Sequence, residues 1–289
     1  MRRAIAVSTL LIVVSALAGC GGQGERPQES HSAETDGVQL PPTQGIFDYQ
    51  LGGAYDSVQM ETGDSAPAVV VRDATATALD GAYSICYVNG FQTQPDEAEE
   101  WLTSRAHLLL RDSKGEPEPD PDWPDEYILD PSSAENRESI LSIIGPAIDG
   151  CARSGFEAVE IDNLDTWTRF DRINPKGAQA LARAYVDRAH RTGLAIGQKN
   201  AAEIAATAHD DWGFDFAITE ECGVFEECGS YAAAYGTHVL QIEYPDALAD
   251  VGMSFDDVCA DPDRAPLTIL RDPDLVARGE PGYLYDRCD

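Results

Sequence analysis

The chain has 289 residues, and 51 acidic against 20 basic side chains give it a formal net charge of −31 at pH 7. This charge argues against a nucleic-acid partner, because a phosphate backbone needs a basic protein face. It is compatible with a cationic ligand drawn in by the field of the whole protein, and equally with acidity that only keeps an exported protein soluble.

The N-terminus predicts export. Residues 1–3 form a short basic region, and residues 4–18 form an apolar stretch that ends in small side chains. This pattern is typical of a signal peptide, and the stretch is short for a membrane span. The sequence Leu-Ala-Gly-Cys that ends at Cys20 resembles the bacterial lipobox. We therefore expect a lipoprotein signal over residues 1–19, lipidation at Cys20, and anchoring to the outer face of the bacterial cell membrane. The alternative is an ordinary signal peptide with a chance cysteine.

Residues 20–44 predict a flexible linker. They are rich in Gly, Gln, Glu, Ser and Pro, and such a segment buries too little apolar surface to fold. Residues 45–289 show no break in composition and have a length that suits one domain. We expect a single folded domain over residues 45–289, in a monomer.

Six cysteines remain besides Cys20, and an even number in an exported chain permits disulfides. Cys222 and Cys228 are close in sequence and are the favoured local pair. A Cys259–Cys288 pair would fix the C-terminus, and Cys86–Cys151 is then left by elimination. Six cysteines allow fifteen pairings, so other connectivities stay open. A metal site is the rival hypothesis. The chain has no CxxC pair and no HExxH motif, and its five histidines are scattered, so we expect no metal.

Eight apolar, strand-like segments follow one another along the domain: 45–50, 68–73, 82–88, 155–162, 194–200, 214–219, 238–243 and 266–271. Helical or helix-length segments alternate with them, most clearly the helices that begin after Asp130 and at Asn174-Pro175. Residues 115–125 are dense in proline and acid, which predicts a loop long enough to shape a pocket rim. The alternation predicts an α/β fold, a single (β/α)8 TIM barrel.

Several enzyme classes are excluded by missing motifs. No GxGxxG sequence follows the first strand, so we expect no nicotinamide or flavin cofactor. No P-loop and no GxSxG elbow is present either, which argues against serine-hydrolase chemistry.

Acids, amides and a lysine gather where the later strands end. They occupy residues 162–165, 198–200, 220–221 and 243–244. In a parallel barrel these positions converge on one face. A pair of carboxylates there suits glycosidic cleavage, in which one donates a proton to the leaving oxygen and the other attacks the sugar or activates water. Helix capping is the alternative for any single acid, but it explains less well why all four strand ends carry such groups.

The same blocks, in the same order, resemble glycoside hydrolase family 114, which contains endo-α-1,4-polygalactosaminidases with a TIM-barrel fold. The resemblance runs from about Tyr49 to Tyr244 and is carried most specifically by the sequences Glu-Ile-Asp-Asn-Leu-Asp at 160–165 and Gly-Gln-Lys-Asn at 197–200. It implies that Asp162 and the first glutamate of Glu-Glu-Cys, Glu220, form the catalytic pair. By analogy, Asp162 is the nucleophile and Glu220 the general acid/base.

The resemblance also implies a substrate-binding set, which comprises Asp48, Tyr49, Tyr87, Asn163, Asp165, Lys199, Asn200, Glu221, Glu243 and Tyr244. Lys199 serves alternatively to keep Asp162 ionised. Glu221 is alternatively a helix-capping or supporting acid, and tyrosines in strands are more often core residues. The acids Asp165 and Glu243 are expected to face the ammonium group of an amino sugar.

The chain departs from the family pattern at residues 46–49, 88–91 and 131–132, which are expected to shape the pocket rim. The sequence therefore predicts a glycoside hydrolase acting on an α-1,4-linked, galactosamine-containing polysaccharide. The alternatives are a surface lipoprotein that binds carbohydrate on the same barrel without cutting it, a hydrolase of a different α-glycan, and a metal-dependent hydrolase.

Overall fold

The computed structural model describes residues 37–60 and 63–289. The predicted signal peptide, Cys20 and the first part of the linker lie outside the described residues. Within them, no helix is long and apolar enough to cross a membrane. Residues 37–44 contact the sheet: the Tyr83 hydroxyl donates a hydrogen bond to the Gln39 carbonyl, and Leu40 packs against the apolar interior. Ordered contacts thus begin upstream of Gly45.

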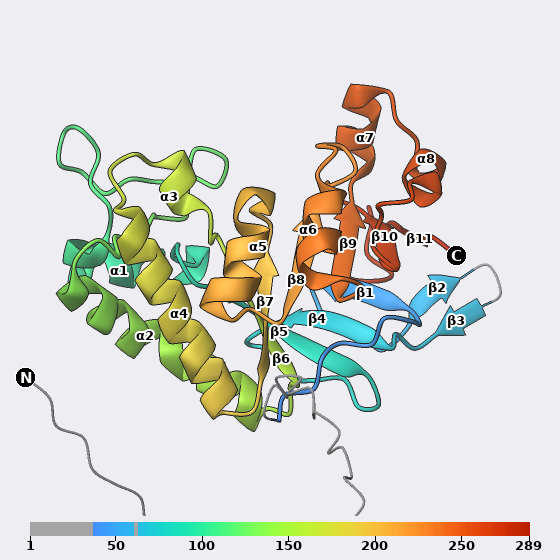
Figure 1. Ribbon diagram of the computed structural model, residues 1–289, viewed down its shortest axis with the longest axis horizontal. Helices are drawn as coiled ribbons and strands as arrows, with labels where there is room; N and C mark the ends of the chain where they lie inside the picture. The colour runs from blue at the N-terminus through green and yellow to red at the C-terminus, as the bar shows by residue number, and fades with distance from the viewer. Residues whose placement is uncertain (1–36, 61–62) are drawn as a thin grey trace, which may run out of the picture. The chain divides into compact units, whose positions relative to one another are not determined.

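A curled nine-stranded sheet forms the centre of residues 37–289 (Figure 1). In spatial order its strands are β1 (Phe47–Gln50), β4 (Val69–Asp73), β5 (Tyr83–Asn89), β6 (Ala158–Asp162), β7 (Ala195–Lys199), β8 (Phe216–Glu220), β9 (Val239–Glu243), β10 (Leu267–Arg271) and β11 (Tyr285–Arg287). Neighbours from β1 to β10 pair in parallel, and β11 pairs antiparallel to β10. All eight predicted strands are confirmed, in the predicted order.

The helices lie in the later crossovers. They are α1 (Ala98–Ser104), α2 (Ala134–Arg153), α3 (Thr166–Arg169), α4 (Pro175–Arg191), α5 (Ala205–Thr207), α6 (Cys228–Tyr235), α7 (Pro245–Val251) and α8 (Phe255–Ala260), with short turns η1 (Pro95–Glu97), η2 (Ala106–Leu108), η3 (Ala202–Ile204) and η4 (Ala208–Trp212). The predicted alternation is wrong for the first two crossovers. The described part of the first holds a hairpin, β2 (Val58–Met60) and β3 (Gly63–Ser65), and the nine residues of the second are too few for a crossing helix.

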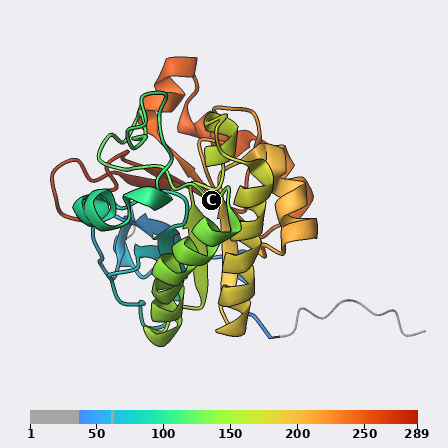
Figure 2. The same ribbon diagram turned by 90° about the vertical axis from the view of Figure 1, so that its left-hand side faces the viewer.

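Helices α2 and α4 begin where capping residues predicted them. The Ser133 hydroxyl accepts a hydrogen bond from the Asn136 amide, and the Asn174 side chain accepts one from the Lys176 amide at the start of α4. Pro175 occupies the first turn of α4, where its missing N–H costs nothing. The two helices pack side by side on one face of the sheet (Figure 2).

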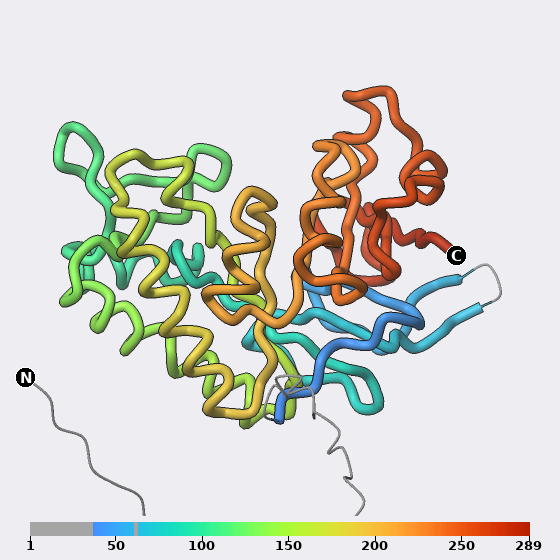
Figure 3. Tube along the Cα trace, in the orientation of Figure 1, coloured from blue at the N-terminus to red at the C-terminus, as the bar shows by residue number. Residues whose placement is uncertain are grey.

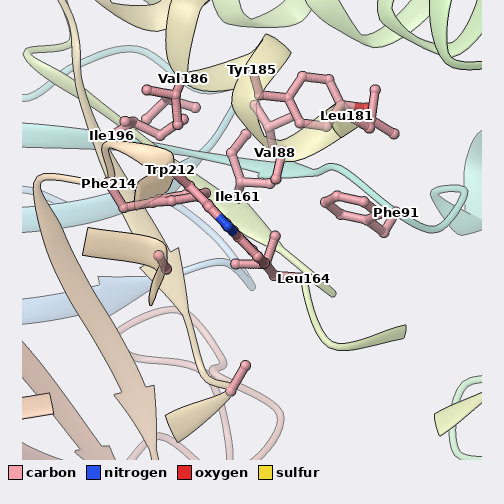
Figure 4. Packing of buried hydrophobic residues seen from close by; sticks show 14 of the residues in the cluster. Val88, Phe91, Ile161, Leu164, Leu181, Tyr185, Val186, Ile196, Trp212 and Phe214 are labelled. Atoms are coloured by element: carbon pink, nitrogen blue, oxygen red, sulfur yellow. The ribbon is translucent and has the colours of Figure 1, made fainter. Parts of the chain in front are cut away.

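Two apolar cores arise because successive side chains of a strand point to opposite faces. Outward-facing residues such as Val88, Ile161 and Ile196 pack against α4 (Figure 4). Inward-facing residues of β1 to β10 form a second core enclosed by the sheet. Gly197 faces that interior, and a larger residue would not fit there because its Cβ would come within 2.6 Å of the Phe216 ring. Burial on both faces explains why the strands read as continuous apolar runs.

The first and the last parallel strands meet along a seam that side chains hold. The described strand pairs do not include a ladder between β1 and β10. Instead, the fully buried Arg271 of β10 lies 2.9 Å from Asp48 Oδ1 and also donates to the Tyr49 carbonyl. Above it, Gly52 bridges to Val276, and a Cβ on Gly52 would come within 2.4 Å of a backbone oxygen. The sheet therefore curls until its first and last parallel strands, β1 and β10, are joined by an ion pair.

The three predicted disulfides are confirmed. Cys86–Cys151 ties β5 to α2, Cys222–Cys228 closes the turn after β8, and Cys259–Cys288 attaches the C-terminal strand β11 to α8. By the chain-entropy relation for loop closure, the short loop contributes about 2 kcal/mol and each of the longer loops about 4 kcal/mol.

Replacing Arg271 by Met is expected to lower the free energy of unfolding by about 3–5 kcal/mol, because the buried Asp48 carboxylate would lose its counter-ion. Replacing Arg278 by Met, in the more exposed pair with Asp64, is the control and should cost about 1 kcal/mol or less. Urea unfolding with the disulfides intact measures both changes. Equal losses in the two variants would show that the seam does not depend on this ion pair.

Candidate active site

A cleft of about 830 Å³ opens at the carboxyl ends of the parallel strands. Segments after β1, β6, β7, β8, β9 and β10 contribute to its lining, together with residues from the segment 120–126. This segment belongs to the long excursion between β5 and α2, whose backbone can be followed in Figure 3. Ten carboxylate side chains line the cleft against two basic ones, Arg169 and Lys199. The cleft is therefore strongly negative, and it lies at the face where sequence analysis placed the functional groups.

Lys199 is at the centre of the charged groups. Its ammonium nitrogen lies 2.8 Å from Glu220 Oε2, 3.8 Å from Asp162 Oδ1 and 3.8 Å from Glu160 Oε1. The side chain is only 4% exposed. Burial lowers the pKa of Lys199, but the surrounding carboxylates outweigh this effect and hold the pKa well above its ordinary value. Lys199 is therefore a fixed positive charge within 4 Å of three acidic side chains.

Glu160 lies below the cleft and is fully buried. The Tyr49 hydroxyl donates a 2.9 Å hydrogen bond to its Oε1, while its Oε2 has no hydrogen-bond partner among the described residues. Burial raises the pKa of Glu160 to about 8, although the Lys199 charge acts in the opposite direction. Glu160 is accordingly protonated at neutral pH, so it does not compete with Glu220 for the charge of Lys199.

Glu220 is held by three donors. Its carboxylate accepts hydrogen bonds from Tyr244 Oη at 2.5 Å, Lys199 Nζ at 2.8 Å and Asn200 Nδ2 at 3.1 Å. Asn200 also accepts a hydrogen bond from the Glu220 backbone amide. Burial alone would raise the pKa of Glu220, but the Lys199 charge and these hydrogen bonds outweigh it and lower the pKa. Glu220 is thus an ionised carboxylate in a fixed orientation.

Asp162 is oriented from both sides. Its Oδ2 accepts a 2.7 Å hydrogen bond from the Tyr87 hydroxyl, and its Oδ1 accepts a 2.8 Å bond from the Asn163 backbone amide. The Asp162 oxygen and the Glu220 oxygen that contact Lys199 are therefore at most 6.6 Å apart, the sum of their distances to the nitrogen. Two oriented carboxylates at this separation can act on the two sides of one bond.

The same backbone turn follows strands β6, β7 and β8, which end in Asp162, Lys199 and Glu220. Asn163, Asn200 and Glu221 have φ angles of 60°, 49° and 60°, in the left-handed region that non-glycine residues rarely adopt. Each comes directly after Asp162, Lys199 or Glu220. The turns redirect the chain immediately after these residues, at a cost of the order of 1–2 kcal/mol per turn.

A polar network fixes the rim on the side of β5 and β6. The buried Asp120 accepts hydrogen bonds from Arg169 Nη1 and Gln92 Nε2, each at 2.7 Å. Both donors also bond to the Asn163 side chain at 3.0 Å. Glu126 lies in the same rim and accepts from Asn89. Burial, with the Asp162 charge, raises the pKa of Glu126 to about 7.

The structure brings most of the predicted site residues together. Nine line the cleft: Tyr87, Asp162, Asn163, Asp165, Lys199, Asn200, Glu220, Glu221 and Tyr244. Three do not. Asp48 pairs with Arg271 in the seam, and Tyr49 lies buried beneath Lys199. Glu243 is buried on the outer face of β9, where it accepts hydrogen bonds from the Gly223 amide and from Gln241. Glu243 and Asp48 therefore do not face the cleft.

Sequence reasoning missed Glu160, Arg169, Glu126, Trp123 and Phe225. Glu160 carried a usable signal, because it stands two residues before Asp162 on the same strand face. Glu126, Trp123 and Phe225 lie outside regular elements and Arg169 ends the one-turn helix α3, so none of the four shows a periodic pattern, and only the predicted rim loop at 115–125 pointed to their neighbourhood.

One group among the described residues has the spacing of metal ligands: Cys222, Cys228 and Glu243. The two sulfur atoms are joined in a disulfide, so they are not free to coordinate an ion.

Comparison with known proteins places this geometry in a family. The model of glycoside-hydrolase family GH114 matches residues 27–289. Ega3 from Aspergillus fumigatus, solved in complex with galactosamine, has a TM-score of 0.65 and 20% identity, and the match covers 88% of this chain and 99% of that chain. The glycoside hydrolase domain of PelA from Pseudomonas aeruginosa has a TM-score of 0.58 and 12% identity over 81% of this chain and 97% of its own. At these identities the two structures show a shared fold. No curated protein matches the chain by sequence.

Replacing Glu160 by Gln is expected to reduce the pH dependence of stability. Above the ordinary glutamate pKa of 4.5 the unfolded chain loses this proton, while folded Glu160 keeps it to about pH 8, so stability falls as pH rises. Gln keeps the size and the Tyr49 hydrogen bond but has no proton to lose. Between about pH 5 and pH 7 the variant should gain about 2–3 kcal/mol relative to wild type in urea unfolding. A constant difference across this range would contradict a protonated Glu160.

Proposed function

The chain belongs to glycoside-hydrolase family GH114, and from this premise we propose that it hydrolyses an α-1,4-linked, galactosamine-containing polysaccharide, with Asp162 and Glu220 as the catalytic carboxylates. The observation that carries the proposal is the position of both carboxylates on one buried ammonium, Lys199, at the floor of the cleft. Both residues stand at the carboxyl ends of their strands and are held by hydrogen bonds, as expected of a pair that acts across a glycosidic bond.

We take the pair to act by a retaining mechanism, which the limit on its separation allows. Retaining glycosidases hold their carboxyl groups about 5–5.5 Å apart, and inverting ones about 6.5–9.5 Å, to leave room for a water. The upper limit of 6.6 Å between the two oxygens on Lys199 lies at the very bottom of the inverting range. Asp162, oriented by Tyr87 and Asn163, would attack the anomeric carbon. Glu220 would protonate the leaving oxygen from the fraction of molecules in which it carries a proton, a fraction that grows at acidic pH, and as the carboxylate would then activate the water that releases the sugar.

The charge of the cleft supports a cationic substrate. Ten acids line it against two bases, and both bases are already paired with carboxylates. A galactosamine polymer with free amines is a polycation, so the field of the cleft would attract it. Asp165, which sequence analysis assigned to the ammonium group, lines the cleft with Glu203 and Glu227. Ega3, which shares the fold, was solved with galactosamine bound.

The proposal extends to architecture and location. We take the curled sheet as a (β/α)8 TIM barrel whose last junction, between β1 and β10, is made by Arg271 and Gly52 instead of a strand ladder. The lipobox-like sequence at Cys20 supports export with a lipid anchor on the outer face of the cell membrane, where we take the protein to be a monomer. The confirmed disulfides fit an oxidising compartment.

Incubating residues 37–289 with partially deacetylated α-1,4-galactosamine polymer should release oligosaccharides that mass spectrometry detects. Asp162→Asn and Glu220→Gln should each lower turnover by about a thousandfold or more, because each removes one chemical role while keeping the shape of the side chain. Val251→Ala, on an exposed site away from the cleft, is the matched control. Retained binding without fragments from wild type would favour the non-catalytic carbohydrate-binding alternative, and turnover by Asp162→Asn would remove that residue from the pair.

The lowered pKa of Glu220 makes a prediction about pH. As general acid Glu220 must carry a proton, so kcat/KM should fall tenfold per pH unit above its pKa, which lies below the ordinary glutamate value. The optimum is therefore acidic. Tyr244→Phe removes a hydrogen bond to the carboxylate, which raises the pKa and should move the alkaline limb to higher pH.

An alkaline limb near neutral pH that Tyr244→Phe leaves unchanged would contradict this role for Glu220. The acid would then be another carboxyl group in the cleft, and Glu126, whose pKa is raised to about 7, would be the first to test by substitution with Gln.

A further inference from the structure

Two aromatic side chains are exposed in the cleft. Trp123 is 64% exposed and Phe225 is 63% exposed, and both line the cleft. The remaining large apolar side chain of comparable exposure in the described part of the chain, Val251, lies outside it. Large aromatic surfaces held in water at a binding cleft are unfavourable unless a ligand covers them, which makes the pair a candidate for ligand contact.

The backbone fixes Trp123 in place. The buried Asp120 accepts hydrogen bonds through Oδ1 from the amides of Asp122 and Trp123, at 2.9 and 3.3 Å. Its Oδ2 is held by Arg169 and Gln92, the two donors that also bond to Asn163, the residue after Asp162. The indole is therefore an exposed group on a rigid loop that is connected by hydrogen bonds to one member of the carboxylate pair.

A separate device fixes Phe225. The Cys222–Cys228 disulfide closes the turn in which it lies. Within that turn the Phe225 amide donates to the Glu221 carbonyl at 3.0 Å, and the Glu227 amide donates to the Cys222 carbonyl at 2.9 Å. Phe225 thus lies in the middle of a closed turn that begins two residues after Glu220.

The two rings belong to opposite sides of the chemical centre. Trp123 is tied to the ends of β5 and β6, and Phe225 follows β8, so β7 with Lys199 lies between them in the sheet. Each ring has carboxylates beside it in the sequence or on the cleft wall: Asp122 and Glu126 near Trp123, and Glu221 and Glu227 near Phe225. An aromatic face with flanking acids suits a ligand that is apolar on one face and carries an ammonium group.

We propose that Trp123 and Phe225 are two stacking platforms that bind amino-sugar rings on opposite sides of the scissile bond. This inference rests on the proposed function. The platforms would hold the polymer across the carboxylate pair, so that sugar units on both sides of the scissile bond are engaged at once. They are binding residues and take no part in bond cleavage. Because their backbones are fixed before the ligand arrives, little ordering cost is incurred when a sugar stacks on them.

The test uses end-labelled α-1,4-galactosamine oligosaccharides of increasing length with Trp123→Ala and Phe225→Ala. Each variant should raise KM roughly tenfold on long oligosaccharides, with kcat nearly unchanged and with little effect on the shortest substrate that is cut. The labelled products should shift in length in opposite directions in the two variants, because each loses the sugar contact on a different side. Trp123→Phe and Phe225→Tyr keep an aromatic face and should restore most of the affinity, and Val251→Ala should behave as wild type.

The inference would be overturned if KM depended on oligosaccharide length in both alanine variants as it does in wild type, or if their products shifted in the same direction. The proposed function would still stand. If wild type releases no fragments, the proposed function fails and binding decides the inference separately. Titration calorimetry with the partially deacetylated polymer should then show binding by wild type that either alanine substitution weakens about tenfold. Equal affinity of the alanine variants and wild type, or no binding by wild type, would refute the platforms.

Discussion

A single buried ammonium group organises the cleft. Lys199 lies within 4 Å of Glu160, Asp162 and Glu220, and one positive charge cannot balance three negative ones in a buried site. The most deeply buried acid, Glu160, keeps its proton, while the pKa of Glu220 is lowered by the Lys199 charge and by its hydrogen bonds. Asp162 and Glu220 accept hydrogen bonds from Tyr87 and Tyr244, respectively. The contacts of Lys199 limit the separation of the Asp162 and Glu220 carboxylates, because both lie within 4 Å of its ammonium nitrogen.

Several features of the cleft lower the free energy of unfolding, and interactions elsewhere in the chain offset this loss. Three left-handed turns, a buried glutamic acid with an unpaired oxygen and two solvent-exposed rings are each unfavourable in the free protein. The two apolar cores on either side of the sheet and three disulfides offset them. The unfavourable features cluster at the cleft, whereas the stabilising ones lie below and around it, which is the distribution expected of a preorganised site.

The strands, the disulfides and the level of the charged groups were predictable because they depend on local patterns: apolar runs, capping residues, cysteine positions and the type of residue at each strand end. The direction of Glu243 was not. In β9 both faces are buried, so Val239 and Leu240 are equally apolar and no alternation marks which of Glu243 and Tyr244 points inward. The aromatic residues of the cleft rim could not be predicted for another reason. The loop that carries Trp123 is anchored through Asp120 by Gln92 and Arg169, which are 28 and 49 residues away, and no spacing in the sequence encodes these bonds. The Cys222–Cys228 pair was predictable, but its spacing does not show that Phe225 lines the cleft.

The seam between β1 and β10 has a consequence for how the chain acquires its fold. Asp48 and Arg271 are separated by 223 residues, so the partner of a carboxylate made early in synthesis is made near the end. Until then the nascent chain carries an open sheet edge and a charge that cannot yet be buried. Contacts of such long sequence separation form late, because the entropy of closing the loop must be overcome first. A chain truncated before β10 should therefore remain a substrate for chaperones and proteases rather than form a smaller stable domain.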